Sequence, residues 1–250
     1  MQSGQIVMGP AGSGKSTYCL EIYKNMRLTQ SSVKVINLDP SIENIEYPDS
    51  IDIRDLINIE DIMDEFYLGP NGGLIFCMEY FMDNLMWFEK EIQLSAKNHL
   101  IFDLPGQIEL YTHCSLVRDF TIYLAKTFDI NLFGIFLLDC QFIGDIGKFF
   151  GGAITAMCCM FSLELPHFNI LTKIDLIRHL PYSVLEKFLC PSSELFIKEL
   201  EEIVNTKYKI LTKSLLNLLT DFSMVHFIPL DLTRSDQLSN FLQLLHLSME

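Results

Sequence analysis

One nine-residue stretch constrains this chain more than any other feature. Residues 9–17 read GPAGSGKST and match the pattern G-x-x-x-x-G-K-[ST] at every fixed position. In such a loop, glycines let successive backbone N–H groups converge on a phosphate, and the N-terminus of the following helix adds partial positive charge. We therefore expect Lys15 to reach the β- and γ-phosphates of a nucleotide, and the Ser16 hydroxyl to bind a magnesium ion.

The residues around this phosphate loop support the same interpretation. Residues 5–8, with the sequence QIVM, predict a short buried strand before the loop, and residues 17–26 predict a helix after it. The alternative is a glycine-rich turn without a ligand, which a strand and a helix on its two sides make improbable. The predicted nucleotide contacts are Gly12, Ser13, Gly14, Lys15, Ser16 and Thr17.

The composition favours a single folded domain. The 250 residues are 49% hydrophobic and 20% charged, which supports one large core, so we expect one α/β domain over residues 1–250. The net charge is −14 and only five arginines occur, so direct binding of nucleic acid is not expected.

The cysteines and the apolar segments indicate in which cellular compartment the chain is expected. Seven cysteines occur without a C-x-x-C pair, a pattern typical of reduced thiols inside the cell. The phosphate loop begins at residue 9, so we expect no signal peptide and a cytoplasmic location. The apolar residues 149–163 are too few to cross a bilayer and lie between Lys148 and Glu164, which favours a buried helix over a membrane anchor.

Segments of strand and helix pattern alternate along the chain. Strands are predicted at residues 33–38, 99–102, 132–138, 167–171 and 224–229. Helical patterns follow at residues 52–57, 60–67, 141–165, 181–213 and 239–247. This alternation predicts a three-layer P-loop NTPase fold, in which a mostly parallel sheet carries helices on both faces.

The second predicted strand ends in Asp39 and Pro40. In a doubly wound sheet, ligands bind outside the carboxyl ends of the strands, so Asp39 is expected near the nucleotide. Its carboxylate could then order a metal-bound water or the attacking water. The alternative is an aspartate that merely forms a turn before proline, and spacing alone leaves both open.

The third predicted strand runs into the residues DLPGQ at 103–107, which match the D-x-x-G pattern that follows the metal-binding strand in GTP-hydrolysing proteins. Asp103 is expected to hold the magnesium shell, and the Gly106 backbone N–H to contact the γ-phosphate. Gln107 occupies the position of a water-orienting glutamine, and Glu109 lies two residues further on.

The fifth predicted strand runs into Thr172, Lys173, Ile174 and Asp175, which are similar to the guanine-binding motif N-K-x-D. The carboxylate of Asp175 could accept hydrogen bonds from both N–H donors of guanine, whereas adenine has no such pair. Thr172 stands where asparagine is usual. These residues favour guanine over adenine, and residues 230–232 are assigned no contact with the base.

The residues GPNGG at 69–73 predict a loop, and an apolar stripe over residues 74–92 predicts one helix after it. This helix is apolar on several sides, so it should be covered twice, once by its own sheet and once by something else. A second subunit is one candidate, and an unusually thick core within one chain is the alternative. In the first case Asn71 could act on the partner's nucleotide.

Together, the phosphate loop, the residues at 103–107, the T-K-x-D motif and Gly69-Pro70-Asn71 resemble the GPN-loop GTPases over nearly the whole chain. The resemblance implies GTP and Mg²⁺ as substrate and cofactor, and a dimer in which each Gly-Pro-Asn loop reaches the partner's active site. It also implies a heterodimer with a related GPN-loop GTPase, or a homodimer. The implied role is the cytoplasmic assembly and nuclear import of RNA polymerase II, with contacts to its subunits, shuttling to the nucleus, and no membrane.

Two other functions share these motifs. One is a nucleotide-binding pseudo-GTPase, a scaffold that binds nucleotide or a partner without turnover. The other is a P-loop kinase for a small molecule, which would need several arginines to hold two charged substrates, whereas the five arginines here are dispersed.

Overall fold

The computed structural model describes residues 2–29, 32–42, 47, 48, 50–93, 99–179, 181–191, 194–222 and 225–247. Over this part of the chain, a seven-stranded sheet has the order β3-β2-β4-β1-β5-β6-β7, and every neighbouring pair is parallel. The strands are β1 (Gln2–Met8), β2 (Val33–Asn37), β3 (Ile51–Asp52), β4 (His99–Asp103), β5 (Ile130–Asp139), β6 (His167–Thr172) and β7 (Phe227–Pro229).

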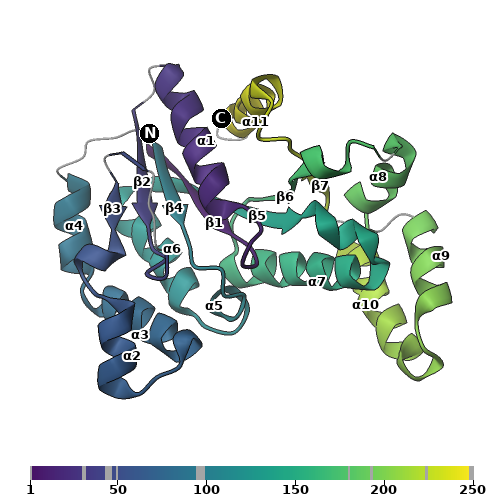
Figure 1. Cartoon of the computed structure of the whole chain (residues 1–250), viewed down its shortest axis with the longest axis horizontal. Helices are drawn as coiled ribbons and strands as arrows, with labels where there is room; N and C mark the ends of the chain where they lie inside the picture. The colour runs from purple at the N-terminus through teal and green to yellow at the C-terminus, as the bar shows by residue number, and fades with distance from the viewer. Residues whose placement is uncertain are drawn as a thin grey trace.

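Helices cover both faces of this sheet (Figure 1). The side chains of β1 alternate between two core clusters: Ile6 and Met8 belong to one, and Val7 to the other. The helices α1 (Lys15–Leu28) and α11 (Ser235–Leu247) pack on the Val7 face. The opposite face carries α3 (Pro70–Asp83), α4 (Leu85–Gln93), α5 (Glu109–Thr112), α6 (Leu116–Phe128) and α7 (Ile146–Leu163). The predicted three-layer α/β fold is therefore confirmed.

The single helix predicted over residues 74–92 is wrong, because the structure has two helices there. The first, α3, ends at Asp83, and Asn84 breaks the helical run. The Asn84 side chain donates to the Tyr80 carbonyl at 2.8 Å, which its own backbone N–H also reaches at 3.1 Å. A short polar side chain that competes for helix carbonyls favours a helix end over continuation.

The loop predicted at residues 69–73 is also wrong in part. Gly69 is the N-cap of α3 and Pro70 is its first residue, so Pro70–Gly73 form the first helical turn. Proline suits this position because its fixed φ is helical and its missing N–H has no partner there in any helix. Asn71 consequently lies at a helix N-terminus.

The second face of α3 is covered by the same chain. The short helix α2 (Ile59–Phe66) packs along it, with the rings of Phe66 and Phe76 at a centroid distance of 4.9 Å. The contact is close at Gly73, where a Cβ would lie 2.8 Å from Met63. The extra apolar surface of this segment is therefore explained by a thick core within one chain, and it does not by itself require a second subunit.

The helix predicted at residues 141–165 is shorter than expected. A 3₁₀ turn covers Cys140–Gly144, and α7 begins after the N-cap Asp145, whose carboxylate accepts from the N–H groups of Gly147 and Lys148. With 18 residues, α7 is the one helix in the described ranges that is long and apolar enough to cross a membrane, so the length argument of the sequence is wrong. Phe149 nevertheless packs against Phe188 and Phe196 from the next two helices.

The C-terminal third and the segment before α2 also differ in detail. The helical pattern at residues 181–213 forms α8 (Tyr182–Leu189), α9 (Glu194–Ile203) and the start of α10 (Lys209–Phe222), with a 3₁₀ turn before α10. The predicted strand at 224–229 is reduced to Phe227–Pro229, and its first residue lies outside the described ranges. Residues 52–57, predicted as helical, contain the end of β3 and a 3₁₀ turn at Ile53–Asp55.

Candidate nucleotide-binding site

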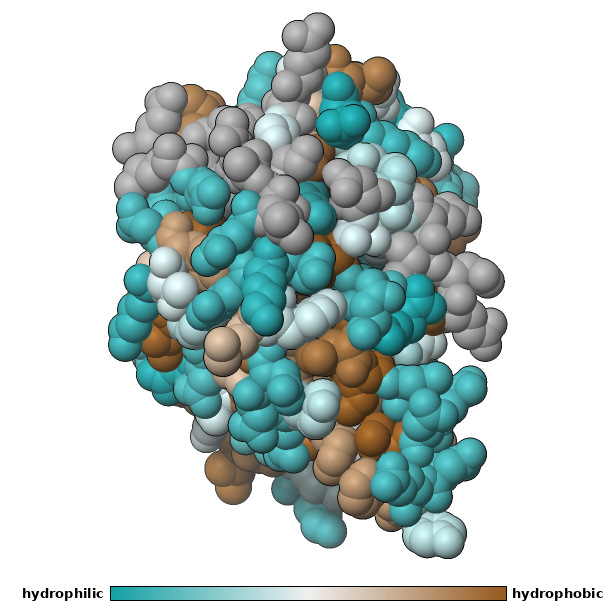
Figure 2. All heavy atoms as spheres, turned by 90° about the vertical axis from the view of Figure 1, so that its left-hand side faces the viewer, coloured by the Kyte–Doolittle hydropathy of each residue, from teal (hydrophilic) through white to brown (hydrophobic). Residues whose placement is uncertain are grey.

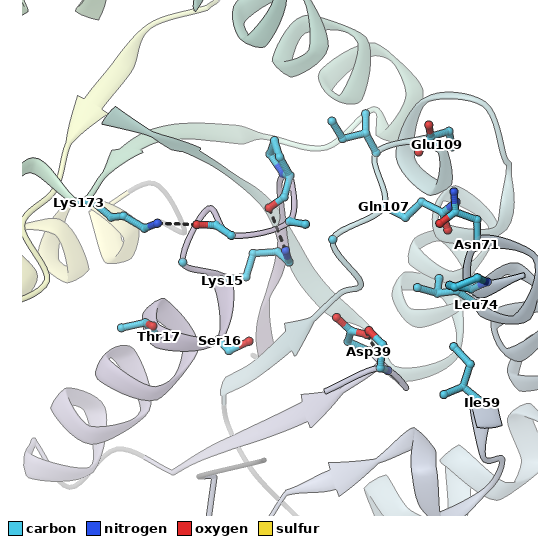
Figure 3. Close-up of a pocket in the computed structure, with 18 residues that line it drawn as sticks. Lys15, Ser16, Thr17, Asp39, Ile59, Asn71, Leu74, Gln107, Glu109 and Lys173 are labelled. Carbon is cyan, nitrogen blue, oxygen red and sulfur yellow. Dashed lines mark hydrogen bonds between the residues drawn. The ribbon is translucent and has the colours of Figure 1, made fainter. Parts of the chain in front are cut away.

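A cavity of about 760 Å³ opens at the carboxyl ends of the central strands (Figure 3). It is large enough for a small-molecule cofactor, and its position is the one expected for ligands of a parallel sheet. Its wall contains eleven of the predicted site residues: Gly12, Gly14, Lys15, Ser16, Thr17, Asp39, Asn71, Gly106, Gln107, Glu109 and Lys173. The predicted residues Ser13, Asp103, Thr172 and Asp175 lie outside this wall.

The phosphate loop has the backbone that its glycines permit. Gly9, Gly12 and Gly14 all have positive φ, and a Cβ at Gly9 would lie 2.3 Å from the Leu137 carbonyl oxygen. No other residue type could occupy that position without moving β5. The loop therefore passes close to the end of β5 and continues directly into α1 at Lys15.

Lys15 is directed across this loop. Its ammonium donates to the carbonyl oxygens of Gly9 and Pro10, each at 3.2 Å, and the residue is 7% exposed. Burial lowers the pKa of the Lys15 ammonium, while the nearby carboxylates of Asp103 and Asp39 oppose that change. The lysine is thus held by two weak neutral acceptors, which a phosphate oxygen can replace with a charge-assisted bond.

Three residues of the predicted site carry polar atoms without a partner in the described part of the chain, and one of them, Gln107, lines the cavity. Ser13 Oγ, Asp103 Oδ1 and Gln107 Oε1 are buried without a hydrogen-bond partner among the described residues. Buried polar groups are normally paired, since an unpaired group costs about 1–3 kcal/mol. The unpartnered Gln107 Oε1 on the cavity wall, together with the ammonium groups of Lys15 and Lys173, indicates that the ligand of this cavity is polar.

The residues present fit a magnesium ion. Ser16 and Asp103 offer hydroxyl and carboxylate oxygens, the donors that Mg²⁺ prefers, and Mg²⁺ needs few protein ligands because water and phosphate supply the rest. Burial raises the pKa of the Asp103 carboxyl to about 6, although hydrogen bonds from Tyr47 and Ser16 and the charge of Lys15 lower it. A bound cation would compensate the charge of this buried carboxylate.

The segment after Asp103 approaches the phosphate loop closely. A Cβ at Gly106 would lie 2.9 Å from the Ala11 Cα atom and 3.1 Å from the Lys15 ammonium. Only glycine allows this approach, and it places the Gly106 backbone beside the phosphate region. Gln107 and Glu109 follow on the same wall, with Glu109 at the start of α5.

The Gly-Pro-Asn segment lines the chain's own cavity. Pro70 and Asn71 belong to its wall, and Figure 3 shows Asn71 on the same side as Gln107, across the cavity from Lys15. The chain therefore brings Asn71 to its own phosphate region. Asn71 could therefore act on a nucleotide bound in its own chain or on one bound in a partner chain.

Asp39 is held by residues that sequence reasoning missed. Its backbone N–H donates to Asn37 Oδ1 at 3.1 Å, while Asn37 Nδ2 donates to the Asp39 carbonyl and to Asp52 Oδ1. Arg54 in turn forms an ion pair with Asp52 at 2.9 Å and donates to the Ile42 carbonyl at 2.6 Å. This network fixes the turn after β2, and the Asp39 carboxylate itself accepts from the Ser41 N–H at 2.9 Å, so Asp39 forms this turn and also lines the cavity.

The T-K-x-D motif lies beside the phosphate loop. The Thr172 hydroxyl is fully buried and donates to the Ser13 carbonyl at 2.7 Å, and Lys173 Nζ donates to the Gly12 carbonyl at 2.7 Å. Lys173 also forms an ion pair with Asp139 at 2.7 Å. Thr172 thus holds the phosphate loop through its hydroxyl. The asparagine that is usual at this position of the guanine-binding motif would hold the loop in the same way.

Asp175 follows in a 3₁₀ turn at Ile174–Ile177 and is partly buried. Its carboxylate has no hydrogen bond within the described part of the chain, so its acceptors are available to a ligand. The neighbouring Arg178 forms an ion pair with the buried Asp231 and donates to Thr233 at 2.9 Å. Residues 230–232, which were assigned no contact with the base, therefore support the turn that carries Asp175.

Comparison with known proteins agrees with this geometry. A family model described as "Conserved hypothetical ATP binding protein" matches residues 7–250. Two relatives named GPN-loop GTPase 3 are 44% identical over 240 residues in Kluyveromyces lactis and 41% identical over 249 residues in Danio rerio. The first alignment covers 96% of this chain and 89% of the relative, and the second covers 98% and 87%.

A solved structure shows the same fold. It is a GTPase from Pyrococcus abyssi in its apo form, with a TM-score of 0.78 at 19% identity, and the match covers 97% of this chain and 95% of that one. The phosphate loop, the residues after β4 and the Gly-Pro-Asn segment lie around one cavity, and relatives above 40% identity cover nearly the whole chain. The chain therefore belongs to the GPN-loop GTPase family, among the relatives named GPN-loop GTPase 3.

Proposed function

We propose that this chain binds GTP with Mg²⁺ in the cavity and hydrolyses it slowly. The observation that carries the proposal is that Lys15, Lys173 and the unpartnered Gln107 Oε1 line one cavity. The buried Ser13 Oγ and Asp103 Oδ1, in the phosphate loop and at the end of β4, also have no partner among the described residues. Two cations and several unused hydrogen-bonding atoms suit a phosphate chain better than an apolar ligand.

The roles of the residues follow from their positions. The loop N–H groups and Lys15 bind the phosphates, and Mg²⁺ held through Ser16 and Asp103 would neutralise phosphate charge. Gln107 orients the attacking water, with Asp39 or Glu109 accepting a hydrogen bond from it. Asp175 selects the base, with Thr172 and Lys173 holding its loop against the phosphate loop.

Replacing Gln107 by leucine should slow hydrolysis while nucleotide binding is retained. Gln107 Oε1 has no partner among the described residues, so its removal breaks no internal hydrogen bond. An interaction made only in the transition state lowers kcat without changing affinity, and loss of one water-orienting group is expected to cost about 10²-fold. Single-turnover hydrolysis and equilibrium titration with a fluorescent GTP analogue measure the two effects separately.

A matched control is Gln141→Leu, since Gln141 is exposed and lies outside the cavity wall. It should leave both measurements unchanged. If the Gln107 variant turns over at the wild-type rate, the water-orienting role passes to Asp39 or Glu109, and the corresponding alanine variants would identify which.

We also propose that the chain works as a dimer with a related GPN-loop GTPase, in the cytoplasmic assembly and nuclear import of RNA polymerase II. This role is what the resemblance to the GPN-loop GTPases implies. Large apolar side chains also remain exposed on α2–α4: Phe66, Tyr67, Tyr80 and Met86 are 48%, 95%, 40% and 73% exposed. Figure 2, which views the molecule from the left-hand side of Figure 1, shows hydrophobic residues gathered in the lower half of that face. Such a patch is typical of a protein interface.

A heterodimer allows an experiment that distinguishes whether Asn71 acts on the nucleotide of its own chain or on that of the partner. In a heterodimer whose partner carries an inactivated phosphate loop, all turnover occurs at this chain's site. If Asn71 acts on the partner's nucleotide, Asn71→Ala in this chain should leave the turnover of that complex intact. In the reverse complex, this chain carries Lys15→Ala and all turnover occurs at the partner's site. Adding Asn71→Ala to this chain should then reduce the partner's turnover about tenfold or more.

Light scattering with GTP and the candidate partner establishes first that the complex forms. Asn217→Ala is a suitable control, since Asn217 is exposed on α10 and lies outside the cavity wall. A persistent monomer, or undiminished turnover at both sites after Asn71→Ala, would remove the role in the partner's site.

The two alternatives remain distinguishable by turnover. Within the described ranges no arginine lines the cavity, which disfavours a kinase that must bind two charged substrates. A pseudo-GTPase would bind GTP without releasing phosphate, alone or with its partner. Measuring phosphate release from GTP and from ATP, by the chain alone and in complex, decides among the three.

A further inference from the structure

Tyr47 occupies an unexpected position beside the predicted magnesium residues. It lies in the connection between β2 and β3 and is 7% exposed. Its hydroxyl oxygen lies 2.7 Å from Asp103 Oδ2 and 3.1 Å from the Ser16 backbone oxygen. Both of these atoms are acceptors, so the hydroxyl is the donor, and the shorter distance makes the carboxylate its main acceptor.

This hydrogen bond makes the two carboxylate oxygens of Asp103 different from one another. Asp103 is fully buried, and Oδ2 receives the Tyr47 hydroxyl while Oδ1 has no partner among the described residues. A carboxylate with one oxygen held cannot rotate freely about its terminal torsion. Tyr47 therefore fixes the orientation in which Oδ1 is presented.

The tyrosine ring is itself held firmly. It belongs to the core cluster on the α1 face of the sheet, together with Val7 and Cys19, so the hydroxyl is positioned by packing and not by a mobile side chain. The same connection between β2 and β3 begins with Asp39 and Ser41, which line the cavity. Tyr47 thus joins the segment that carries Asp39 to Asp103, a residue that would hold the magnesium ion.

We propose that Tyr47 is a positioning residue for the magnesium ion of the bound nucleotide. It holds Asp103 through Oδ2 so that Oδ1 remains the acceptor for the hydration shell of the ion, and it ties the connection after Asp39 to that same carboxylate. The proposal rests on the nucleotide function proposed above. Neither the phosphate-loop motif nor the D-x-x-G pattern contains this residue.

The test is the variant Tyr47→Phe, which removes the hydroxyl and keeps the ring in the core. Protein loaded with a fluorescent GDP analogue is titrated with Mg²⁺ in an EDTA-buffered series, and the Kd for Mg²⁺ is read from the change in fluorescence or in nucleotide dissociation rate. A hydrogen bond to a charged group is usually strong enough to change this constant on the order of tenfold. We expect weaker Mg²⁺ binding by that factor, with nucleotide affinity in EDTA unchanged.

The matched control is Tyr18→Phe. Tyr18 is fully buried in the same core cluster, and its hydroxyl donates to Gln5 Oε1 at 2.7 Å, away from Asp103. This variant also loses one buried tyrosine hydroxyl, so it measures the general effect of that loss on Tm. It should leave the Kd for Mg²⁺ at the wild-type value.

The outcomes separate this proposal from the proposed function. If wild-type protein shows no nucleotide binding, or binding independent of Mg²⁺, the function itself fails. If wild-type protein depends on Mg²⁺ and Tyr47→Phe has the same Kd for Mg²⁺, the tyrosine has only a structural role and the proposal is overturned. Tighter Mg²⁺ binding in Tyr47→Phe would also overturn it, because the hydroxyl would then compete with the ion for Asp103.

Discussion

Lys15→Ala is expected to lower GTP affinity by about 30-fold to more than 10³-fold, a loss that takes binding out of the measurable range at micromolar protein. Lys15 is 7% exposed, and among the described residues its ammonium donates to the carbonyls of Gly9 and Pro10. Removing one partner of a buried hydrogen-bonded charge pair costs about 2–5 kcal/mol or more, and each 1.4 kcal/mol is tenfold in affinity. Isothermal titration with GTP and Mg²⁺ measures the loss.

Lys24→Ala is the control for this variant. Lys24 lies on the same helix, is largely exposed, and forms an ion pair with Glu21 at 2.8 Å. An exposed pair contributes about 1 kcal/mol or less to stability, so GTP affinity should stay at the wild-type value. Circular dichroism and Tm of both variants show whether either change acts through the fold. Normal GTP binding by folded Lys15→Ala protein would exclude this loop as the phosphate site.

The phosphate loop could be predicted from sequence because the pattern that identifies it is local. Gly9, Gly12 and Gly14 have positive φ, and Lys15 and Ser16 follow at the start of a helix. The strand before the loop and Asp103 at the end of β4 are likewise indicated by residues within a few positions along the chain. The contact of Gly9 with the Leu137 carbonyl of β5 is tertiary and could not be predicted in this way.

The errors have a local and a tertiary cause. The stripe over residues 74–92 has helical periodicity throughout, and the Asn84 side chain, which donates to the Tyr80 carbonyl, marks the end of the first helix. The covering of α3 by α2 depends on contacts such as that between Phe66 and Phe76, which periodicity within one segment does not contain. A second subunit was therefore a reasonable expectation for a surface that the chain itself covers in part.

The missed residues of the site have the same origin. Tyr47 is 56 positions from Asp103, and Arg178 is 53 positions from Asp231. No local pattern connects either pair. The pair of Asn37 and Asp52 is closer in sequence, and an asparagine at the end of a buried strand was the one available signal that the turn before Asp39 is braced.

The choice of base is the second large expected effect, and Asp175 carries it. The family model matched by this chain is described as ATP-binding, whereas its relatives are named GTPases. The carboxylate of Asp175 has no internal hydrogen bond in the described part of the chain, so it needs donors from the ligand. Guanine supplies two, and adenine would leave a partly buried carboxylate unpaired.

The unmutated chain should accordingly prefer GTP over ATP by about 10⁴-fold, since a site built for hydrogen bonds rejects an analogue that lacks them by this order. Asp175→Asn should reduce GTP affinity and raise the affinity for xanthosine triphosphate, whose C2 carbonyl can accept from the new amide. Competition titrations with the three nucleotides give the ratios directly. The exposed Asp221 on α10 offers the matched change Asp221→Asn, which should leave every ratio unaltered.

Equal affinity of the wild-type chain for ATP and GTP would contradict the assignment of Asp175 and support the ATP-binding description. A strong preference for GTP that survives in Asp175→Asn would move base selection elsewhere in the turn. The Arg178–Asp231 ion pair then becomes informative, because it holds this turn without facing the cavity wall. If Arg178→Ala weakens all three nucleotides equally while Asp175→Asn changes their ratio, the ion pair positions the turn and the Asp175 carboxylate alone reads the base.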